Sequence, residues 1–301
     1  MYAQRRPTVP VARRSSVIYP DPKLDATRLI ETVRLPMKDH DAGEARETDA
    51  ALFTLSGGEG DDVLLLLHGL GATADVWSPL IRRLSGVWRG RWLAPDLPGH
   101  GRSPKATNYA IGAQAATVTR LLPAGSRVYV LAHSLGGVIG VLLASQWFGA
   151  AVHAVTAFSV KVTWTDEERD MAARRASATL KYFASRGEAL TFYLKVSGLA
   201  GLVLEDDPVA ARGVVQEVAG WRLAADPATA GVGGQPLAPM LAAATCSIVL
   251  CAGRRDPMVK LDTLRSMHSQ VVDLGDLGHN PHVEAPDVIL QLVRDLSVKC
   301  G

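Results

Sequence analysis

Short apolar runs and amphipathic segments alternate along most of this chain. The apolar runs of strand length lie at 51–55, 63–67, 91–95, 127–132, 151–160, 247–252 and 271–274. Segments with helical spacing lie between them, at 76–84, 111–122, 135–148, 261–268 and 288–296. The run at 63–67 has no polar face, which is typical of a strand covered on both sides in a parallel sheet. The pattern predicts an α/β fold, with a mostly parallel central sheet flanked by helices.

One long stretch, residues 161–235, interrupts this alternation with helical patterns alone. Thr165 and Glu168 form a capping box at the start of a predicted helix. A second helix is predicted over 189–196. A third is predicted over 207–223, where aspartate supplies an N-cap and proline occupies the first helical position. We therefore expect an all-helical cap inserted into the α/β unit.

The same pattern divides the chain into a tail, a core and the inserted cap. The first twenty residues contain four arginines and three prolines but no acidic residue, and we predict a disordered tail at 1–25. The two parts of the α/β core are predicted at 26–160 and 236–301, with the cap at 161–235 between them.

Composition and charge exclude several classes of function. Charged residues make up 21% of the chain and the net charge is +2, so we expect no nucleic-acid partner. No apolar run approaches the roughly 18 residues of a membrane span, and the N-terminal segment lacks the apolar region of a secretory signal. The three cysteines have no regular spacing, which argues against a disulfide framework. We predict a cytoplasmic protein.

A serine lies where the strand predicted at 127–132 passes directly into a helix. Strand, sharp turn and helix are the context of a nucleophile elbow, which presents the serine hydroxyl to a substrate. Small residues lie two positions before and after Ser134, at Ala132 and Gly136, so that strand and helix can approach closely. The helix N-terminus favours developing negative charge, and the Leu135 N–H is placed to donate to an oxyanion.

Four further motifs resemble the α/β-hydrolase superfamily, in its branch of small enzymes with a helical cap. His68–Gly71 is similar to the family's oxyanion turn, and the segment 96–103 to the loop after its fourth strand. The segment 253–257 resembles its acid loop, and 278–286 its histidine loop. The resemblance extends from about residue 60 to residue 297.

The resemblance implies a catalytic triad in the chain order Ser134, Asp256, His279. His279 would take the proton of the Ser134 hydroxyl, and Asp256 would orient the imidazole. The N–H groups of Leu70 and Leu135 would form the oxyanion hole.

Some positions leave alternatives open. Asp226 and Asp276 are weaker candidates for the acid, and His282 competes with His279 for the role of base. No cluster of carboxylates and cysteines completes a metal site around these histidines, so we expect neither metal nor cofactor. Ala132 stands where the family's usual elbow has glycine, which adds one methyl between strand and helix.

Six aromatic residues are candidates for the substrate pocket, although aromatics at helical spacing also form ordinary core. They are Trp77, Trp164, Phe183, Phe192, Tyr193 and Trp221.

The leading hypothesis for function is hydrolysis of small-molecule carboxylic esters with small or medium, apolar acyl groups, through an acyl-enzyme. C–C bond hydrolysis of a dicarbonyl or dienoic acid is the nearest alternative. It needs cationic side chains for substrate carboxylates, and the candidates are Arg102, Arg169, Arg174 and Arg175. Thioester cleavage, acyl transfer and cofactor-free haloperoxidase chemistry use the same triad. A non-catalytic ligand receptor is the alternative from another class, since fold does not fix function. The oligomeric state is not predicted.

Overall fold

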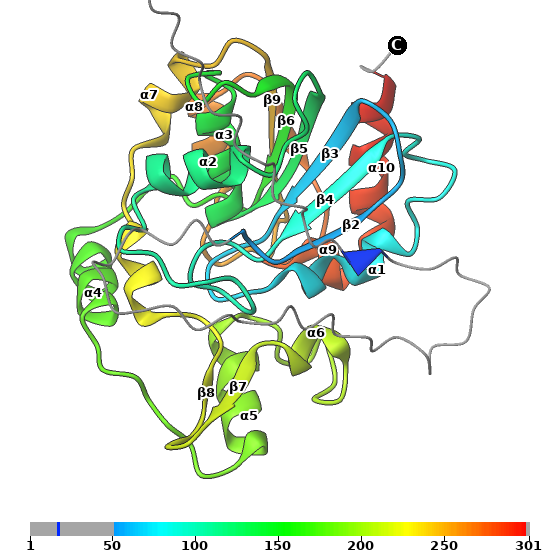
Figure 1. Ribbon diagram of the computed structural model, residues 1–301. Coiled ribbons are helices and arrows are strands. Elements are labelled where there is room, and N and C mark those ends of the chain that lie inside the picture. Colours follow the sequence, from blue (N-terminus) through cyan, green and yellow to red (C-terminus); the bar gives the residue numbers. More distant parts are fainter. Residues whose placement is uncertain (1–16, 19–50, 299–301) are drawn as a thin grey trace, which may run out of the picture.

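The computed structural model describes residues 17–18 and 51–298. Its main sheet has eight strands in the order β1-β2-β4-β3-β5-β6-β9-β10. They are β1 (Val17–Ile18), β2 (Thr54–Gly57), β3 (Asp62–Leu67), β4 (Arg91–Pro95), β5 (Arg127–His133), β6 (Ala151–Phe158), β9 (Ser247–Ala252) and β10 (Val271–Asp273). The β2–β4 pair is antiparallel and every other neighbouring pair is parallel. The predicted α/β fold with a mostly parallel sheet is confirmed (Figure 1).

Only a small part of the predicted tail at 1–25 can be compared with the structure. Val17–Ile18 pair in parallel with Leu55 and Ser56 of β2. The rest of that prediction, and the beginning of the predicted core segment 26–160, lie outside the described residues.

Helices cover both faces of the sheet (Figure 1). One face carries η2 (Ala74–Trp77), α1 (Ser78–Ile81), α9 (Pro281–Glu284) and α10 (Pro286–Ser297). The other carries α2 (Ile111–Thr119), α3 (Leu135–Leu143), α7 (Leu237–Ala242) and α8 (Leu261–Met267). Even-numbered leucines of β3 join the core of the first face and its odd-numbered apolar residues join the core of the second, because strand side chains alternate between faces.

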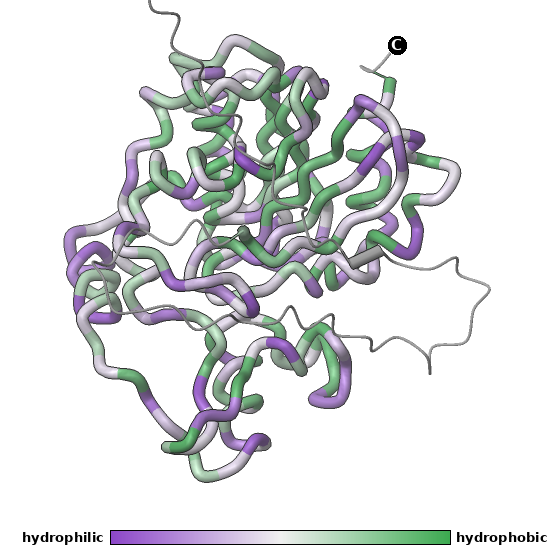
Figure 2. The backbone as a smooth tube through the Cα atoms, in the orientation of Figure 1, coloured by the Kyte–Doolittle hydropathy of each residue, from purple (hydrophilic) through white to green (hydrophobic). Residues whose placement is uncertain are grey.

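This two-sided burial explains the uninterrupted apolar runs. Residues 63–67 of β3 have no exposed surface, and hydrophobic segments concentrate along the central strands (Figure 2). Full burial of one leucine contributes about 2 kcal/mol to folding, so a polar residue within β3 would be costly. The central strands therefore lie in a closely packed interior, which tolerates little movement of the residues at their ends.

The candidate residues Ser134 and Asp256 follow the carboxyl ends of the parallel strands β5 and β9, and His279 follows β10. The strands β4, β3, β5, β6 and β9 end at Pro95, Leu67, His133, Phe158 and Ala252. Because these strands are parallel, their carboxyl ends meet at one edge of the sheet, which is where ligands bind in folds of this class.

The elements between residues 161 and 235 lie beyond this edge (Figure 1), and this segment is called the cap below. Its elements are α4 (Asp166–Ala176), α5 (Arg186–Val196), α6 (Pro208–Ala211), β7 (Val214–Glu217), β8 (Gly220–Leu223) and η3 (Pro227–Val232). The capping box of Thr165 and Glu168 is present as expected. The prediction of an all-helical cap is wrong, because β7 and β8 form an antiparallel hairpin.

The hairpin replaces most of the helix predicted over 207–223. Asp207 does cap a helix, but that helix ends at Ala211. Gly213 follows with no room for a side chain, since a Cβ built there would lie 2.2 Å from the Tyr193 ring. Trp221 of β8 then exchanges backbone hydrogen bonds with Phe183, at 2.7 and 2.9 Å. Pairing with a distant segment thus overrides the local helical signal.

Candidate active site

Ser134 occupies a strained turn between β5 and α3. Its backbone has φ 50° and ψ −113°, a conformation that few residues with a side chain adopt. Strain of this kind persists only where the surrounding structure enforces it, and it is concentrated at functional sites. The predicted strand–turn–helix around Ser134 is therefore present in the structure.

Glycines allow α3 to begin directly against the sheet. A Cβ built on Gly136 would lie 2.4 Å from the carbonyl oxygen of Leu67. Further along α3, a Cβ built on Gly140 would lie 3.0 Å from Val130 Cγ1 of β5, and at the ordinary contact distance of 3.5 Å from the Cβ of Ala132. The methyl of Ala132, the departure from the usual elbow motif, is fully buried between strand and helix.

The predicted acid and base of the triad lie in direct contact. His279 Nδ1 is 2.9 Å from Oδ2 and 3.1 Å from Oδ1 of Asp256. Asp256 Oδ1 also accepts a hydrogen bond from the Met258 N–H at 2.9 Å. Burial by itself would raise the pKa of Asp256, but the hydrogen bond and charge interaction with His279 and the Met258 amide hold this pKa below its ordinary value. Asp256 is thus a buried carboxylate in hydrogen-bond contact with the His279 imidazole.

His133 connects the nucleophile loop to the histidine loop. Its ring stacks on Phe158 at 5.3 Å between centroids and meets the His279 ring edge-on at 4.9 Å. Burial lowers the pKa of His133 well below its usual range, so the ring is neutral and Nε2–H donates to the His279 carbonyl at 2.8 Å. This contact could not be found from the sequence, because the two residues are 146 positions apart.

The predicted oxyanion turn lies beside Ser134. A Cβ built on Gly69 would lie 3.2 Å from the Ser134 Cβ. His68 braces the turn from inside: its Nδ1 contacts the Gly69 carbonyl at 2.8 Å and its Nε2 accepts from the Leu97 N–H at 2.9 Å. Burial lowers the pKa of His68, which keeps the ring neutral, as this bonding pattern requires.

The N–H groups predicted to bind the oxyanion are available. Within the described part of the chain, no backbone hydrogen bond uses the N–H of Leu70 or of Leu135. The next amide, Gly136 N–H, donates to the His68 carbonyl at 3.1 Å and so ties α3 to the oxyanion turn.

An ion cluster lies behind the oxyanion turn. The Asp96 carboxylate accepts from the Ala74 N–H at 2.6 Å and from Arg102 Nε at 2.8 Å, and Arg102 also binds Asp75. Burial raises the pKa of Asp75. Burial by itself would raise the pKa of Asp96 too, but the hydrogen bond and charge of Arg102, with the Ala74 amide, together outweigh it and lower this pKa. Arg102 thus forms ion pairs with both carboxylates. Its guanidinium carbon also lies 3.6 Å from the centroid of the Phe53 ring.

Comparison with known proteins agrees with this geometry. A family model described as the alpha/beta hydrolase family matches residues 64–292. The chain belongs to this family. Ser134, Asp256 and His279 all lie within the matched range.

Relatives of this alpha/beta hydrolase include several proteins named as ester-cleaving enzymes. It is 39% identical over 90 residues to pimeloyl-[acyl-carrier protein] methyl ester esterase of Edwardsiella ictaluri, a match that covers 30% of this chain and 33% of the relative. It is 32% identical over 104 residues to lipase 1 of Psychrobacter immobilis, covering 33% and 32%. The matched segments thus span about a third of these relatives.

Solved structures share the fold over nearly their whole length. E-2-(acetamidomethylene)succinate hydrolase superposes with a TM-score of 0.70 at 23% identity, covering 84% of this chain and 98% of the other. The thioesterase domain from the curacin biosynthetic pathway gives 0.66 at 19% identity, covering 80% and 93%. At these identities the likeness shows the fold alone.

Two of the predicted pocket aromatics are fully buried near the site of this alpha/beta hydrolase. The Trp77 ring lies 5.9 Å from Phe158 and 4.9 Å from His282, between ring centroids. Tyr193 of α5 is 1% exposed and belongs to the same apolar core as Trp77 and Phe158. One face of α5 is therefore buried in this cluster, against α6, β7 and β8 of the cap, and contact of either ring with substrate stays a prediction.

The other four aromatics lie within the cap. Phe183 and Phe192 face each other at 5.3 Å and line an open cavity of about 480 Å³ with Lys181, Glu188, Thr191 and Lys195. The lining residues of α5 are spaced three and four apart, so this cavity lies on the face of α5 opposite the buried Tyr193. Trp221 is half-buried against the core, and Trp164 packs under Lys161 at 4.8 Å. Their predicted place in a substrate pocket is not tested by these positions.

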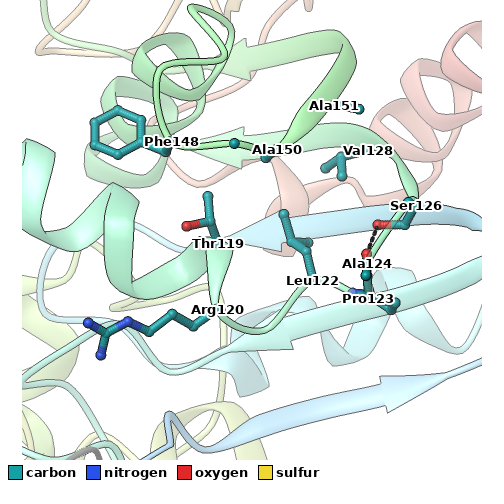
Figure 3. A pocket seen from close by; sticks show the side chains of 12 residues that line it. Thr119, Arg120, Leu122, Pro123, Ala124, Ser126, Val128, Phe148, Ala150 and Ala151 are labelled. Atoms are coloured by element: carbon teal, nitrogen blue, oxygen red, sulfur yellow. Dashed lines mark hydrogen bonds between the residues drawn. The ribbon is translucent and has the colours of Figure 1, made fainter. Parts of the chain in front are cut away.

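A second cavity, of about 300 Å³, lies at the opposite end of the sheet (Figure 3). It is lined by the loop before β5, including Pro123 and Ser126, and by Phe148 and Ala151 before β6. Ser134 follows the other end of β5, roughly 20 Å away at 3.3 Å per residue. This cavity is therefore separate from the candidate active site.

Metal-ligand side chains were compared across the chain from residue 51 to residue 298 and at residues 17–18. Among them, no three histidine, cysteine or acidic side chains gather in an arrangement suited to a metal ion. A search of the same residues finds no helix with the length and apolar character needed to cross a membrane.

Proposed function

We propose that this chain hydrolyses carboxylic esters of small or medium apolar acyl groups, with Ser134 as the nucleophile, His279 as the base and Asp256 as its partner. The observation that carries the proposal is the strained elbow at Ser134, which adjoins both the oxyanion turn and, through His133, the histidine loop. The ester-cleaving activities in the names of its relatives support the same reaction class.

In the first half of the reaction the Ser134 hydroxyl attacks the ester carbonyl. The Asp256 contact occupies His279 Nδ1, which leaves Nε2 to accept the proton of the hydroxyl. The tetrahedral intermediate then collapses, the C–O bond to the alcohol breaks, and His279 returns the proton to the leaving alkoxide. The acyl group remains on Ser134.

In the second half, water releases the acid. His279 takes a proton from water, and the hydroxide adds to the acyl carbonyl; collapse of this intermediate returns the proton to Ser134 and frees the carboxylic acid. In both halves the N–H groups of Leu70 and Leu135 bind the oxyanion. Preorganised donors of this kind usually make the largest electrostatic contribution to such reactions.

The ion cluster favours an ester over a substrate with extra carboxylates. C–C hydrolysis of a dicarbonyl or dienoic acid needs free cations, and Arg102 is already bound by two carboxylates. The other candidates, Arg169, Arg174 and Arg175, lie exposed on α4. No cation named as a candidate is thus free beside Ser134.

The test combines a covalent probe with a substrate series. A fluorophosphonate should label wild-type protein on Ser134, and p-nitrophenyl esters of graded acyl length should be hydrolysed with a maximum at short or medium chains. Ser126→Ala, at the opposite end of β5, is the matched control and should keep both properties. Absence of labelling and of ester turnover in folded wild-type protein would overturn the proposal.

A further inference from the structure

The residue that follows the proposed catalytic base extends into the cap. Asn280 is 5% exposed, and its side-chain Nδ2 donates to the carbonyls of Ser197 at 3.0 Å and Gly198 at 3.2 Å. These two residues form the C-terminal turn of α5, where a helix leaves carbonyl groups without helical partners. One side chain therefore joins the histidine loop to the end of a cap helix.

The backbone of Asn280 is fixed to the core at the same time. Its carbonyl accepts from the N–H groups of Val283 and Glu284, both at 3.0 Å, and so begins α9. The Glu284 carboxylate in turn accepts from the Gly278 N–H at 2.8 Å. Because both sides of His279 are held in this way, a displacement of the α5 terminus reaches the base without an intervening flexible segment.

The other polar attachment of the cap lies on a different loop. Asp226 N–H donates to the Gly99 carbonyl at 2.8 Å, and the Asp226 carboxylate accepts from the Tyr109 hydroxyl at 3.1 Å. Among the described residues, the bonds of Asn280 are the side-chain hydrogen bonds that join the cap to the loop of the base. The side chain of Asn280 therefore links the histidine loop to the α5 terminus, independently of the attachment at Asp226.

We propose that Asn280 is a positioning residue that couples the position of the α5 terminus, which its side chain binds, to the orientation of His279. The proposal rests on the proposed function, since it takes His279 as the base. With the α5 terminus in place, Asn280 holds the histidine loop where Nδ1 meets Asp256. With the α5 terminus displaced, the loop loses this restraint, and His279 spends less time in the productive orientation.

A glycine pair in the cap gives a matched test of this coupling. Gly198 and Gly201 both have positive φ, +69° and +78°. A Cβ on Gly198 would lie 3.0 Å from Asn280 Nδ2, whereas a Cβ on Gly201 would meet no atom within 4 Å. Gly198→Ala and Gly201→Ala therefore share the strain of left-handed alanine, and only Gly198→Ala also disturbs the Asn280 contact.

The first measurement is a double-mutant cycle on ester hydrolysis. Asn280→Ala and Gly198→Ala should each lower kcat about tenfold, the scale of losing one or two hydrogen bonds, with KM changed less than kcat. The double variant should also lose about tenfold, because both changes break the same contact. Gly201→Ala should stay close to wild type. Independent losses that multiply, or an equal loss in Gly201→Ala, would overturn the coupling.

The second measurement is amide hydrogen exchange, which requires no turnover. Asn280→Ala should accelerate exchange in both 278–284 and 193–200, whereas Gly201→Ala should affect the cap segment alone. Asn280→Asp keeps the size of the side chain and removes the donor, and it replaces Asn280→Ala if the alanine variant does not fold. Unchanged exchange in 278–284 would refute the coupling. If Asn280→Ala accelerates exchange in both segments but the wild-type protein has no esterase activity, the proposed function is refuted. The link between the two segments is then still supported.

Discussion

Helix α3 of the core and helix α4 of the cap differ in burial, in composition and in the contacts that hold them in place. Helix α3, which begins at Ser134, buries eight of its nine residues and contains three glycines. Helix α4 of the cap has eleven residues, none of them buried. Its capping box and charged pairs such as Arg169 with Asp166 stabilise the helix itself. The first helix is positioned by contact with the sheet, and the second by close contact with η3 of the cap, where a Cβ built on Gly233 would lie 3.0 Å from the Ala172 Cβ.

The difference indicates how the molecule divides its tasks. Close backbone contact fixes α3 and hence Ser134, since close-packed interiors tolerate little movement. Exposed ion pairs contribute typically less than 1 kcal/mol, so those of α4 add little to its stability, and α4 contacts its own cap rather than the sheet. We infer that the core edge determines the chemistry, whereas the cap determines which substrates reach it. The predictions below test this division, beginning with the core.

The largest effect is expected from the triad itself. Ser134→Ala should lower kcat/KM for a p-nitrophenyl ester by about 10⁴-fold or more, since only oxyanion binding would then remain. His279→Ala should be nearly as damaging. The double variant should be no worse than either, because the two residues act as a unit. Steady-state kinetics on purified variants provide the measurement.

His282 provides the control for the identity of the base. It is fully buried against Trp77, and burial lowers the pKa of its imidazole to about 3. His282→Ala should reduce thermal stability by leaving a cavity, with much of the activity retained in folded protein. If His282→Ala abolishes turnover while His279→Ala is mild, the base has been assigned wrongly.

Breaking the ion cluster of Asp75, Asp96 and Arg102 should lower the free energy of unfolding. The pKa of Asp96 is lowered in the folded state, so its contribution is fully present above the unfolded pKa of about 4 and is lost as the pH falls through the folded value. Asp96→Asn should therefore cost roughly 3 kcal/mol at pH 7, the scale of breaking a buried ion pair, and little at low pH. Urea unfolding at several pH values measures this difference.

Asp75 makes a matched comparison within the same cluster. Its pKa is raised by burial, so its charged form costs stability and this cost disappears as the pH falls through the raised value. Asp75→Asn should consequently cost less at pH 7 than Asp96→Asn. Equal losses at neutral pH, or a larger loss for Asp75→Asn, would contradict the opposite pKa directions.

Removal of an oxyanion donor should cost about as much free energy in catalysis as Asp96→Asn costs in stability. Leu135→Pro removes a backbone N–H at the first position of α3, where the fixed φ of proline suits a helix. Loss of that donor should cost about 3 kcal/mol in transition-state binding. Leu135→Ala retains the N–H and should keep most of the activity. Equal kcat/KM values for the two variants would argue against an amide from Leu135 in the oxyanion hole.

Local patterns were enough to predict the part of the molecule that the sheet positions. The strands at Arg91–Pro95 and Ser247–Ala252 have the predicted bounds, and the elbow at Ser134 follows its strand as expected. His279 and Asp256 were predicted from the order of motifs, and the structure brings them together. In each case the signal is contained in a short segment.

Features that depend on distant segments could not be predicted from the sequence. The β7–β8 hairpin was predicted as helix because the N-cap at Asp207 is genuine, whereas the backbone pairing of Trp221 with Phe183 is non-local. The roles of His133 and Asn280 depend on partners 146 and 83 positions away along the chain. No local spacing reports such contacts, since they arise only after the sheet and cap have assembled.

The smallest effect is expected in the cap, where acyl-chain preference should change with little loss of rate. Tyr193 is buried in the same apolar cluster as Trp77, with its ring against Gly213, and among the described residues its hydroxyl has no hydrogen-bond partner. Tyr193→Leu should enlarge this buried space and shift the optimum of kcat/KM toward longer acyl chains. One methylene in an apolar pocket is worth about 1–3 kcal/mol, so the shift should be modest. The p-nitrophenyl ester series measures it.

Phe192 supplies the matched control, because it lies one residue away on the opposite face of α5. Phe192→Leu should leave the chain-length profile unchanged, since its ring lines the outer cavity with Phe183. Thermal unfolding of both variants separates pocket effects from loss of core packing. A shifted profile in Phe192→Leu, with an unchanged one in Tyr193→Leu, would place the acyl chain on the outer face of the cap. That result would contradict the inference that the core edge determines the chemistry and the buried face of the cap determines which acyl chains bind. The substrate would then have to reach Ser134 by a different route.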